Sequence, residues 1–456
     1  MKMFSFFVVM LFCLGVFGLQ EGETEMFKTP QQIHLAYTND PTSMAVSWYT
    51  KDPSDLLGGV WYGIEQQDLG SFSSSTSLAL SDGSGYYHTA VMTGLEPGRI
   101  YHYFVGSRHE FFSDVYTFRI PNPSEKVRIL AFGDMGTFPR GDTTLMHSIR
   151  VHEVNPAEPH RMPTVVLQAG DLMYPFGNGG MIAAWFDAMA KVGARVPFMV
   201  APGNRDQQDI ITERFEMPMA AYGEHPEPAR HNFYYSYDVN CVHFIVISTN
   251  FDTFHSNSHQ YKWLKKDIEQ AQQNVQDPSS SISWIVLMGH TPIYSSSDGH
   301  TQGNHELKLA IEDLLEPVTL CLWGDDHVYE RSYPVFQSIA DIPSNKHVLD
   351  ERPSKPIHIT VGTGGIDNDA WAVDQPDWSA ERLITKGYLS MEAKKNSFSV
   401  AFIDRDSREV RDYFDIHENG GLNAHPLLLA GGFLLFVGLV AMFLKGKKTG
   451  KSGPGV

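Results

Sequence analysis

Cysteine is scarce in this chain of 456 residues, which contains only three. Cys13 lies in an apolar stretch near the N-terminus, and Cys241 and Cys321 each lie in an apolar, strand-like run. Cysteines in such runs favour two buried free thiols over a disulfide, although the sequence leaves the disulfide open. A small, disulfide-dense fold is therefore excluded, and the stability of the protein has to come from its hydrophobic core.

Positive charge and glycosylation signals are also scarce. The chain has 35 Lys and Arg against 53 Asp and Glu, which gives a formal net charge of −18. A surface this acidic repels nucleic acid at long range, so no nucleic acid is expected as a partner. The chain contains no Asn-x-Ser/Thr sequon without proline at x, so N-glycosylation is not expected.

Two apolar runs mark the ends of the chain. Residues 1–18 predict a secretory signal peptide, with a short membrane anchor as the alternative. Residues 426–444 carry no charge and are long enough for one transmembrane helix, and the lysine-rich residues 445–456 predict a cytoplasmic tail. A lipid-anchor signal is the alternative, which the mostly polar tail argues against. We therefore expect a single-pass type I membrane protein of the secretory pathway, with its body extracellular or luminal.

The first part of the body has the pattern of an all-β domain. Residues 30–121 contain short alternating runs, such as Met44–Tyr49, which turn signals separate. Regular short strands of this kind predict a β-sandwich. The segment Leu95–Tyr103 resembles the fibronectin type III turn with its corner tyrosine. Ser71–Ser77 is serine-rich and predicts a loop. No catalytic constellation appears, so this domain is expected to be a packing module.

The period of the apolar residues changes after the linker Pro121–Ser124. Over residues 126–415, strand-like runs alternate with helical stretches, which predicts a layered α/β domain with two sheets flanked by helices. Gln260–Asn274 has apolar residues at helical spacing and predicts an amphipathic helix that packs on a sheet. The later runs, from Ile357 onward, have no clear helices between them and are expected to complete the second sheet.

Five short segments of this domain carry metal-ligand residue types. They are Gly133-Asp134-Met135-Gly136, Gly170-Asp171-Leu172-Met173-Tyr174, Gly203-Asn204-Arg205-Asp206, Gly289-His290 and Gly324-Asp325-Asp326-His327. At least four of them directly follow a strand-like run, so their side chains are expected at the carboxyl edge of a sheet, where open α/β sheets bind ligands. One Gly-Asp pair is ordinary turn chemistry, but five such segments in order argue against unrelated turns.

The residue types in these segments indicate a centre of two metal ions. The candidate ligands are Asp134, Asp171, Tyr174, Asn204, His290, Asp325 and His327. Two ions held by oxygen and nitrogen atoms would activate a hydroxide and hold a phosphoryl oxygen. The phenol of Tyr174 favours a hard trivalent ion such as Fe(III), and the ligand set excludes a thiolate-rich structural zinc site.

The five segments resemble the motifs of the purple acid phosphatases, within the metallophosphoesterases. The family blocks read G-D-x-G, G-D-x-x-Y, G-N-H-E/D, Gly-His and G-H-x-H, and the resemblance runs from Gln31 to about Phe414. It implies that Asp134, Tyr174 and His327 hold Fe(III) and that Asp171 bridges the ions. It also implies that Asn204 and His290 hold a divalent Zn, Fe or Mn ion, and that His300 lies near the substrate.

The chain departs from the family pattern at two positions. Arg205 stands where the third block has a histidine, and Asp325 replaces the first histidine of the last block. Asp325 is still an acceptable metal ligand, and Arg205 can clamp a phosphate with two parallel hydrogen bonds but is no general acid near neutral pH. We hypothesise that the two changes compensate: Asp325 binds the second metal, and Arg205 holds phosphate or pairs with Asp325.

Three functions are consistent with the sequence. The first is a membrane-anchored, extracytosolic acid phosphatase that hydrolyses phosphate monoesters by attack of a metal-bound hydroxide, with Arg205 and His300 as catalytic residues. The second is a catalytically impaired binding protein on the same fold, and the third is a phosphodiesterase or nucleotide hydrolase. The expected partners are a small phosphate ester and the membrane, and a homodimer is left open.

Overall fold

The structure is a computed structural model that describes most of the body of the chain. The described residues are 29–52, 58–107, 111–137, 144–174, 179–218, 232–251, 254–372 and 374–418. The predicted signal peptide, transmembrane segment and tail fall outside these ranges. Within them, no helix combines the length and the apolar character that crossing a membrane requires.

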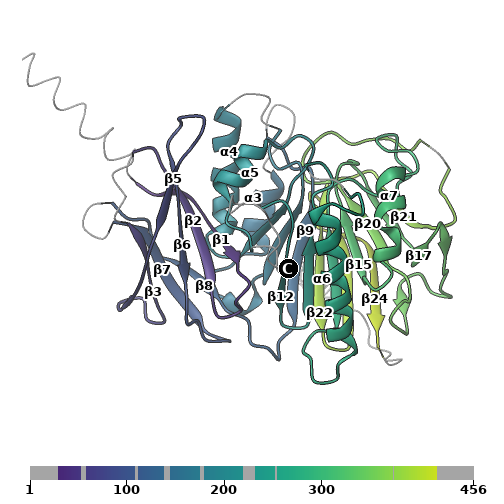
Figure 1. The fold of residues 1–456 in the computed structure, drawn as a ribbon, viewed down its shortest axis with the longest axis horizontal. Coiled ribbons are helices and arrows are strands. Elements are labelled where there is room, and N and C mark those ends of the chain that lie inside the picture. The colour runs from purple at the N-terminus through teal and green to yellow at the C-terminus, as the bar shows by residue number, and fades with distance from the viewer. Residues whose placement is uncertain are drawn as a thin grey trace, which may run out of the picture.

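The first domain is the predicted sandwich of two four-stranded sheets (Figure 1). One sheet has the order β1-β2-β6-β5, with β1 Gln31–Tyr37, β2 Met44–Thr50, β6 Tyr86–Met92 and β5 Thr76–Ala79. The other has the order β4-β3-β7-β8, with β4 Ser71–Ser74, β3 Gly59–Gly63, β7 Ile100–Gly106 and β8 Tyr116–Arg119. The hydroxyl of Tyr101 accepts a hydrogen bond from the backbone N–H of Glu96 at 2.8 Å, which is the contact that a corner tyrosine makes.

The prediction of a loop at Ser71–Ser77 is wrong. This stretch forms β4 and the start of β5, and only Ser75 separates the two strands. β4 pairs with β3 and β5 pairs with β6, so the chain changes sheets at this serine. Phe72 lies opposite Trp61, with ring centroids 4.6 Å apart. Pairing with neighbouring strands outweighs the weak intrinsic preference of the serine-rich sequence.

The second domain contains two seven-stranded sheets with helices outside them (Figure 1). The first sheet has the order β11-β10-β9-β22-β23-β24-β19, with β11 Phe198–Ala201, β10 Val165–Ala169, β9 Val127–Phe132, β22 Gly387–Lys394, β23 Ser397–Asp404, β24 Val410–His417 and β19 Val348–Leu349. The second has the order β12-β13-β14-β15-β20-β16-β21, with β12 Tyr235–Val239, β13 Val242–Val246, β14 Trp284–Met288, β15 Leu320–Trp323, β20 Ile357–Val361, β16 Tyr329–Ser332 and β21 Ser379–Leu383. A two-stranded hairpin, β17 Val335–Phe336 and β18 Ile339–Ala340, stands apart from both. One hydrophobic cluster contains side chains from both large sheets and from the first domain, so the two domains share a core.

The expected placement of the later strands is only partly right. β20 joins the second sheet, as predicted, but β22, β23 and β24 extend the first sheet. β22 lies antiparallel to β9, with Leu389 opposite Ala131. Alternation of apolar residues shows that a strand has a buried face, but it does not show which of two sheets the strand joins, because both present similar apolar edges.

The helices cover the outer faces of the sheets. α3 Thr144–His152, α4 Gly179–Gly193 and α5 Gln208–Arg214 lie between the first sheet and the first domain in Figure 1, whereas α6 His259–Gln276 and α7 His305–Ile311 lie over the second sheet. Two single 3₁₀ turns, η2 Pro159–Arg161 and η3 Glu312–Leu314, complete the helical segments of the described residues.

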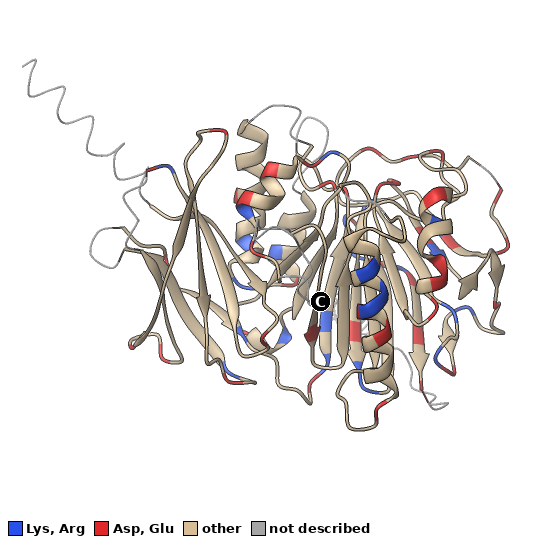
Figure 2. Ribbon diagram, in the orientation of Figure 1, with Lys and Arg blue, Asp and Glu red and all other residues tan. Residues whose placement is uncertain are grey.

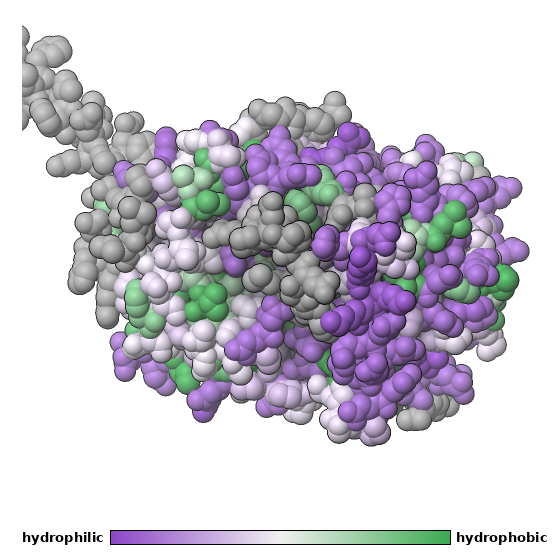
Figure 3. All heavy atoms as spheres, viewed as in Figure 1, coloured by the Kyte–Doolittle hydropathy of each residue, from purple (hydrophilic) through white to green (hydrophobic). Residues whose placement is uncertain are grey.

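The amphipathic helix expected at Gln260–Asn274 is confirmed as α6. Its residues Trp263, Leu264 and Ile268 are buried, and the hydroxyl of Ser258 caps it by accepting from the N–H of Tyr261 at 3.2 Å. The lysines of α6 are exposed, their positions are blue on the helix in Figure 2, and the surface over this helix is hydrophilic in Figure 3. The apolar side therefore packs on the sheet and the charged side meets water.

Both cysteines outside the N-terminal segment are free and buried, as expected. Neither Cys241 nor Cys321 forms a disulfide, and burial raises the pKa of the Cys241 thiol to about 11. A thiol with so high a pKa is a poor nucleophile and metal ligand, so these residues contribute packing only.

His243 has a structural role, but as a charged group. Its Nδ1 lies 2.6 Å from Oδ1 of Asp238, and its Nε2 lies 3.0 Å from Oδ2 of Asp267 on α6. Burial acts to lower the pKa of His243, but hydrogen bonds and attraction from these two carboxylates raise it to about 9. The folded state therefore stabilises the imidazolium of His243.

We expect the protein to become less stable at alkaline pH, because His243 then loses its proton and its attraction to the two carboxylates. The contribution of His243 is fully present below its ordinary pKa of about 6.5 and is lost as the pH rises through the folded value of about 9. It amounts to on the order of 3 kcal/mol in the free energy of unfolding. The free energy of unfolding can be measured with urea at a pH below ~6 and at a pH above ~9.5. It should be lower at the alkaline pH by this amount in the wild type, and the difference should be much smaller in His243→Gln.

A matched control for this prediction is His358→Gln. His358 is also a buried strand histidine, but burial lowers its pKa to about 3, so it stays neutral across the whole range. The unfolded chain protonates His358 below its ordinary pKa of about 6.5, so His358→Gln should relieve a loss of stability at acidic pH, which is the opposite pH dependence to that of His243. A His243→Gln variant that keeps the full pH dependence would contradict the prediction.

Candidate metal centre

The candidate ligands lie where parallel strands end. β9, β10 and β11 run parallel in the first sheet, and β13, β14, β15 and β20 run parallel in the second. Four ligands stand two residues beyond the end of a strand: Asp134 after β9, Asp171 after β10, His290 after β14 and Asp325 after β15. Asn204 stands three residues beyond the end of β11. The side chains therefore meet at the carboxyl ends of strands, as predicted, but the strands belong to two sheets and not to the single sheet expected.

The backbone is strained at four of these positions. The φ angles are 58° at Asp134, 47° at Asp171, 48° at Tyr174 and 66° at Asp325. Positive φ is unfavourable for a residue with a Cβ atom, and such residues cluster at functional sites. The described part of the chain has ten non-glycine residues with positive φ, and the ligand candidates supply four of them. The surrounding fold therefore holds these loops in a conformation that an isolated loop would avoid.

The glycines before the ligands let the loops approach one another. A Cβ atom on Gly170 would lie 2.3 Å from Nδ1 of His290, and one on Gly324 would lie 2.6 Å from Oδ2 of Asp134. Both distances are far shorter than any real contact of a Cβ atom. The Gly-Asp pairs in the sequence thus reflect close packing of the site as well as turn geometry.

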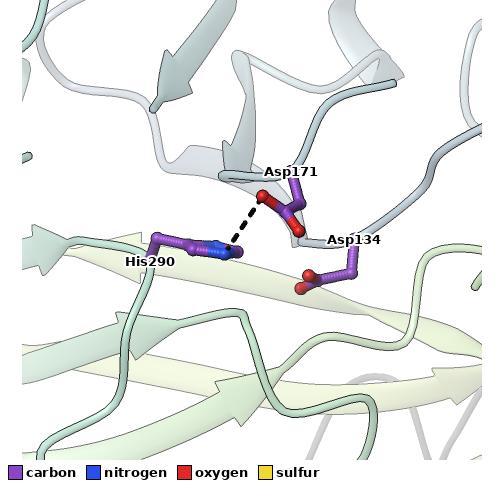
Figure 4. A group of neighbouring side chains, drawn as sticks. All are labelled: Asp134, Asp171 and His290. Atoms are coloured by element: carbon purple, nitrogen blue, oxygen red, sulfur yellow. Dashed lines mark ion pairs between the residues drawn. The ribbon is translucent and has the colours of Figure 1, made fainter. Parts of the chain in front are cut away.

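Three buried side chains form the centre of the cluster. The ligand atoms of Asp134, Asp171 and His290 all lie within 4.8 Å of one another. Figure 4 shows the two carboxylates and the imidazole edge turned toward a common point, with Nε2 of His290 3.3 Å from Oδ1 of Asp171. The side chains of Asp134 and His290 are completely buried.

On one side of this centre lie the residues expected to hold the trivalent ion. The hydroxyl of Tyr174 donates to Oδ1 of Asp134 at 3.1 Å and lies 3.2 Å from Nε2 of His327. The same nitrogen of His327 lies 3.6 Å from Oδ1 of Asp134. Carboxylate, phenol and imidazole thus meet, although Asp134 and His327 are separated by nearly two hundred residues.

On the other side lie the residues expected to hold the divalent ion. Oδ1 of Asp325 lies 3.5 Å from Nε2 of His290 and accepts from Nδ2 of Asn204 at 3.4 Å. Its other oxygen accepts from the hydroxyl of Thr291 at 2.8 Å. Asp325 therefore occupies the second group of ligands, close to the imidazole of His290.

The chemistry of this donor set fits a bound cation. Nδ1 of His290 donates to the carbonyl oxygen of Ala169 at 2.8 Å, so Nε2 is the nitrogen that faces the carboxylates and is available to bind a metal ion. This Nε2 is buried and has no hydrogen-bond partner in the described structure. No lysine or arginine of the described residues forms an ion pair with Asp134, Asp171 or Asp325. Buried carboxylates and an unpaired imidazole nitrogen are costly unless a cation binds them.

The clustered carboxylates raise the pKa values of the neighbouring histidines. Burial acts to lower the pKa of His290, but Asp171 and Asp325 raise it well above its ordinary value. Burial likewise opposes the charge on His327, whereas Asp134 and Asp369 raise its pKa to about 10. The cluster thus attracts positive charge strongly, which is the electrostatic property that a metal centre needs.

The two predicted catalytic residues differ in their placement. Nε2 of His300 lies 3.6 Å from Oδ2 of Asp325, so its imidazole reaches the second group of ligands. The side chain of Arg205 is exposed, whereas its backbone N–H donates to Oδ1 of Asp171 at 2.8 Å. Among the described residues, Asp325 bonds to Thr291 and not to Arg205, so the structure does not support the pairing of the two substituted residues.

Further carboxylates escaped the sequence analysis. Asp206 accepts from the N–H of Leu172 at 2.8 Å and from the N–H of Gly203 at 2.9 Å, so it ties two ligand loops together. Burial and the nearby Asp171 raise the pKa of Asp206 to about 8. Asp369 accepts from the backbone N–H of His327 at 2.7 Å. Asp206 belongs to the third motif and could have been found there, whereas no motif marks Asp369.

Comparison with known proteins gives the same family along the body of the chain. Three family models match consecutive parts: Purple acid Phosphatase, N-terminal domain, over residues 30–120; Calcineurin-like phosphoesterase over residues 127–329; and Iron/zinc purple acid phosphatase-like protein C over residues 355–413. The chain belongs to the purple acid phosphatase family. The third match covers strands of both large sheets, β20 and β21 of the second and β22 and β23 of the first, so the likeness extends well beyond the ligand loops.

The relatives carry two kinds of name. "Acid phosphatase type 7" of Homo sapiens is 28% identical over 417 residues, which cover 84% of this chain and 89% of the relative. "Probable inactive purple acid phosphatase 9" of Arabidopsis thaliana is 27% identical over 458 residues, which cover 86% of this chain and 67% of the relative. The purple acid phosphatase PPD1 from yellow lupin (Lupinus luteus) seeds has the same fold, with a TM-score of 0.74 at 20% identity over 86% of this chain and 75% of that one.

Proposed function

We propose that this purple acid phosphatase is an acid phosphatase that hydrolyses small phosphate monoesters at a centre of two metal ions. The observation that carries the proposal is the convergence of seven ligand-type side chains in two groups with Asp171 between them. The names of the type 7 relatives support the same activity. The phosphoesterase class follows from the family, and the monoester preference is the part proposed here.

Each residue of the centre has a separate proposed role in binding a metal ion or the substrate. Fe(III) would be held by Asp134, Tyr174 and His327. A divalent Zn, Fe or Mn ion would be held by Asn204, His290 and Asp325. Asp171 would bind both ions. When bound, two ions supply an activated water molecule and polarise a phosphoryl oxygen. Arg205, exposed beside Asn204, would clamp the phosphate with two parallel hydrogen bonds, and His300 would contact the substrate from the other side.

A substrate panel coupled to metal analysis tests this proposal. The purified ectodomain should hold two metal ions per chain and hydrolyse phosphate monoesters faster than diesters, with its best activity at acidic pH. Faster hydrolysis of diesters or nucleotides would instead favour a phosphodiesterase. Two bound ions without hydrolysis of any ester would overturn the enzymatic function altogether.

The phenol of Tyr174 gives a spectroscopic prediction. If Tyr174 holds Fe(III), the loaded protein should absorb visible light through charge transfer from phenolate to iron. Tyr174→Phe removes the phenolate and should abolish this band, whereas the same change at Tyr86, a half-buried tyrosine of β6 in the first domain, should leave it in place. A band that survives Tyr174→Phe would show that another group binds the iron.

A catalytically impaired binding protein is the second candidate. Two observations favour it: Arg205 and Asp325 stand at family histidine positions, and one relative is named a probable inactive purple acid phosphatase. This function predicts that the second ion fails to bind at any concentration. Titration of the metal-free protein with Zn or Mn ions, followed by metal analysis, separates the two candidates.

We also propose that the protein is anchored in a membrane of the secretory pathway. The apolar residues 1–18 and 426–444 and the lysines of residues 445–456 support a type I orientation. In sealed vesicles, added protease should then remove the tail and leave the metallophosphoesterase domain protected. Digestion of the domain with protection of the tail would overturn this orientation.

A further inference from the structure

Asp326 is a buried carboxylate between two candidate metal ligands in the sequence, yet it faces away from both groups of ligands. Its side chain is completely buried. Its partners lie on the loop that precedes α7, and it makes no contact with Asp134, Asp171 or His290 among the described interactions. A buried carboxylate that binds no metal needs other polar partners to offset the cost of its desolvation.

The contact of Asp326 with His300 is short and has a fixed direction. Oδ1 of Asp326 lies 2.7 Å from Nδ1 of His300. An ionised carboxylate can only accept hydrogen bonds, so Nδ1 carries the hydrogen and donates it. The ring is thereby oriented with Nε2 toward Asp325, whose Oδ2 lies 3.6 Å away. Asp326 thus determines which nitrogen of His300 is presented to the site.

The second oxygen of Asp326 is also occupied. The hydroxyl of Ser295, at the start of the same loop, donates to Oδ2 of Asp326. The loop is further tied to the segment around Ala370, whose carbonyl oxygen accepts from the N–H of Asp298 at 2.9 Å. Both oxygens of the carboxylate therefore have partners, and the bond from Ser295 helps to orient it without His300.

Gly299 shows how closely the loop approaches Asp326. A Cβ atom at this position would lie 2.5 Å from Oδ1 of Asp326 and 3.1 Å from Oδ2 of Asp369. No residue other than glycine fits there without moving one of the two carboxylates. The sequence Gly299-His300 thus places the imidazole directly against Asp326.

We propose that Asp326 is a positioning residue that holds the ring of His300 with Nε2 facing the substrate. The proposal rests on the proposed phosphatase function, in which His300 contacts the phosphate ester. The role is more important in this chain because Arg205 occupies the family position of the other histidine, so His300 is left to supply the imidazole beside the ligands. Asp326 acts through His300 and touches neither substrate nor metal.

The test compares Asp326→Ala and Asp326→Asn with His300→Ala. Asp326→Ala should lower kcat for a phosphate monoester about 10- to 100-fold at unchanged metal content, the usual effect of losing such a partner. Asp326→Asn should recover most of this activity, since its amide oxygen can accept from His300 while its amide nitrogen donates to the hydroxyl of Ser295. In the His300→Ala background, Asp326→Ala should have little additional effect.

A second measurement does not depend on catalysis. In the metal-free full chain, the hydrogen on Nδ1 of His300 should give a proton resonance shifted far downfield by the short bond to a carboxylate. The resonance should be absent in His300→Ala and in Asp326→Ala. Gly299→Ala should shift or broaden it, because the added methyl group displaces Asp326.

The outcomes separate this proposal from the proposed function. A wild type without phosphatase activity overturns the function, while loss of the resonance in both variants would still support the positioning contact. Equal losses of activity from Asp326→Ala with and without His300 would overturn the positioning role. A resonance that Asp326→Ala leaves unchanged would overturn it as well.

Discussion

Replacement of Asp171 by asparagine is expected to remove nearly all metal binding and hydrolysis. Asp171 lies at the centre of the cluster, 3.3 Å from Nε2 of His290, and stands between the two groups of ligands. An amide oxygen binds a cation far more weakly than a carboxylate oxygen, and losing the ions removes several kcal/mol of transition-state stabilisation. Turnover of a phosphate monoester should fall by roughly 10³-fold or more, with a parallel loss of metal from the purified protein.

The matched control for this change is Asp209→Asn. Asp209 lies at the start of α5, a few residues beyond the third motif, and its side chain is exposed. The same chemical change there should leave metal content and turnover near the wild-type values, since surface substitutions of this kind have small effects. An Asp171→Asn protein that keeps two ions and its activity would contradict the assignment of the metal centre.

The second large effect is expected from restoring both family histidines. Arg205→His combined with Asp325→His should raise monoester turnover above that of either single variant. An imidazole general acid is typically worth about 10²–10⁴-fold in rate, and the double change returns imidazole groups to both positions. Arg205→His alone removes a positive charge beside the cluster and leaves the negative charge of Asp325 in place, so it should weaken phosphate binding.

The structure refines how this pair is expected to behave. Asp325 is held by Thr291 and Asn204 and lies near His290, so its placement does not depend on the guanidinium of Arg205. Asp325→His should therefore change metal affinity, and Arg205→His should change the Michaelis constant at constant metal content. If the two single effects simply add in the double variant, for both metal content and turnover, the compensation hypothesis is wrong.

The parts of the fold that could be predicted have local signals. The strands β9, β10 and β14 were visible as apolar runs, and the Gly-Asp and Gly-His pairs after them marked the sheet edge. The helix α6 was visible from its apolar spacing. By contrast, β4 in the serine-rich stretch and the position of β22 beside β9 depend on pairing with strands far away in the sequence. These pairing energies depend on the neighbouring strands, so the local sequence of a strand does not predict them.

The sequence by itself determined which residue types stand at the strand ends, including the two substitutions at Arg205 and Asp325. These features are local, because a motif of four or five residues specifies both the turn and the side chain. Only the tertiary structure decided that Asp325 contacts Thr291 instead of Arg205 and that Asp326 faces His300. Whether two side chains touch depends on how the two sheets pack and how their loops are strained, and no spacing along the chain records that distance.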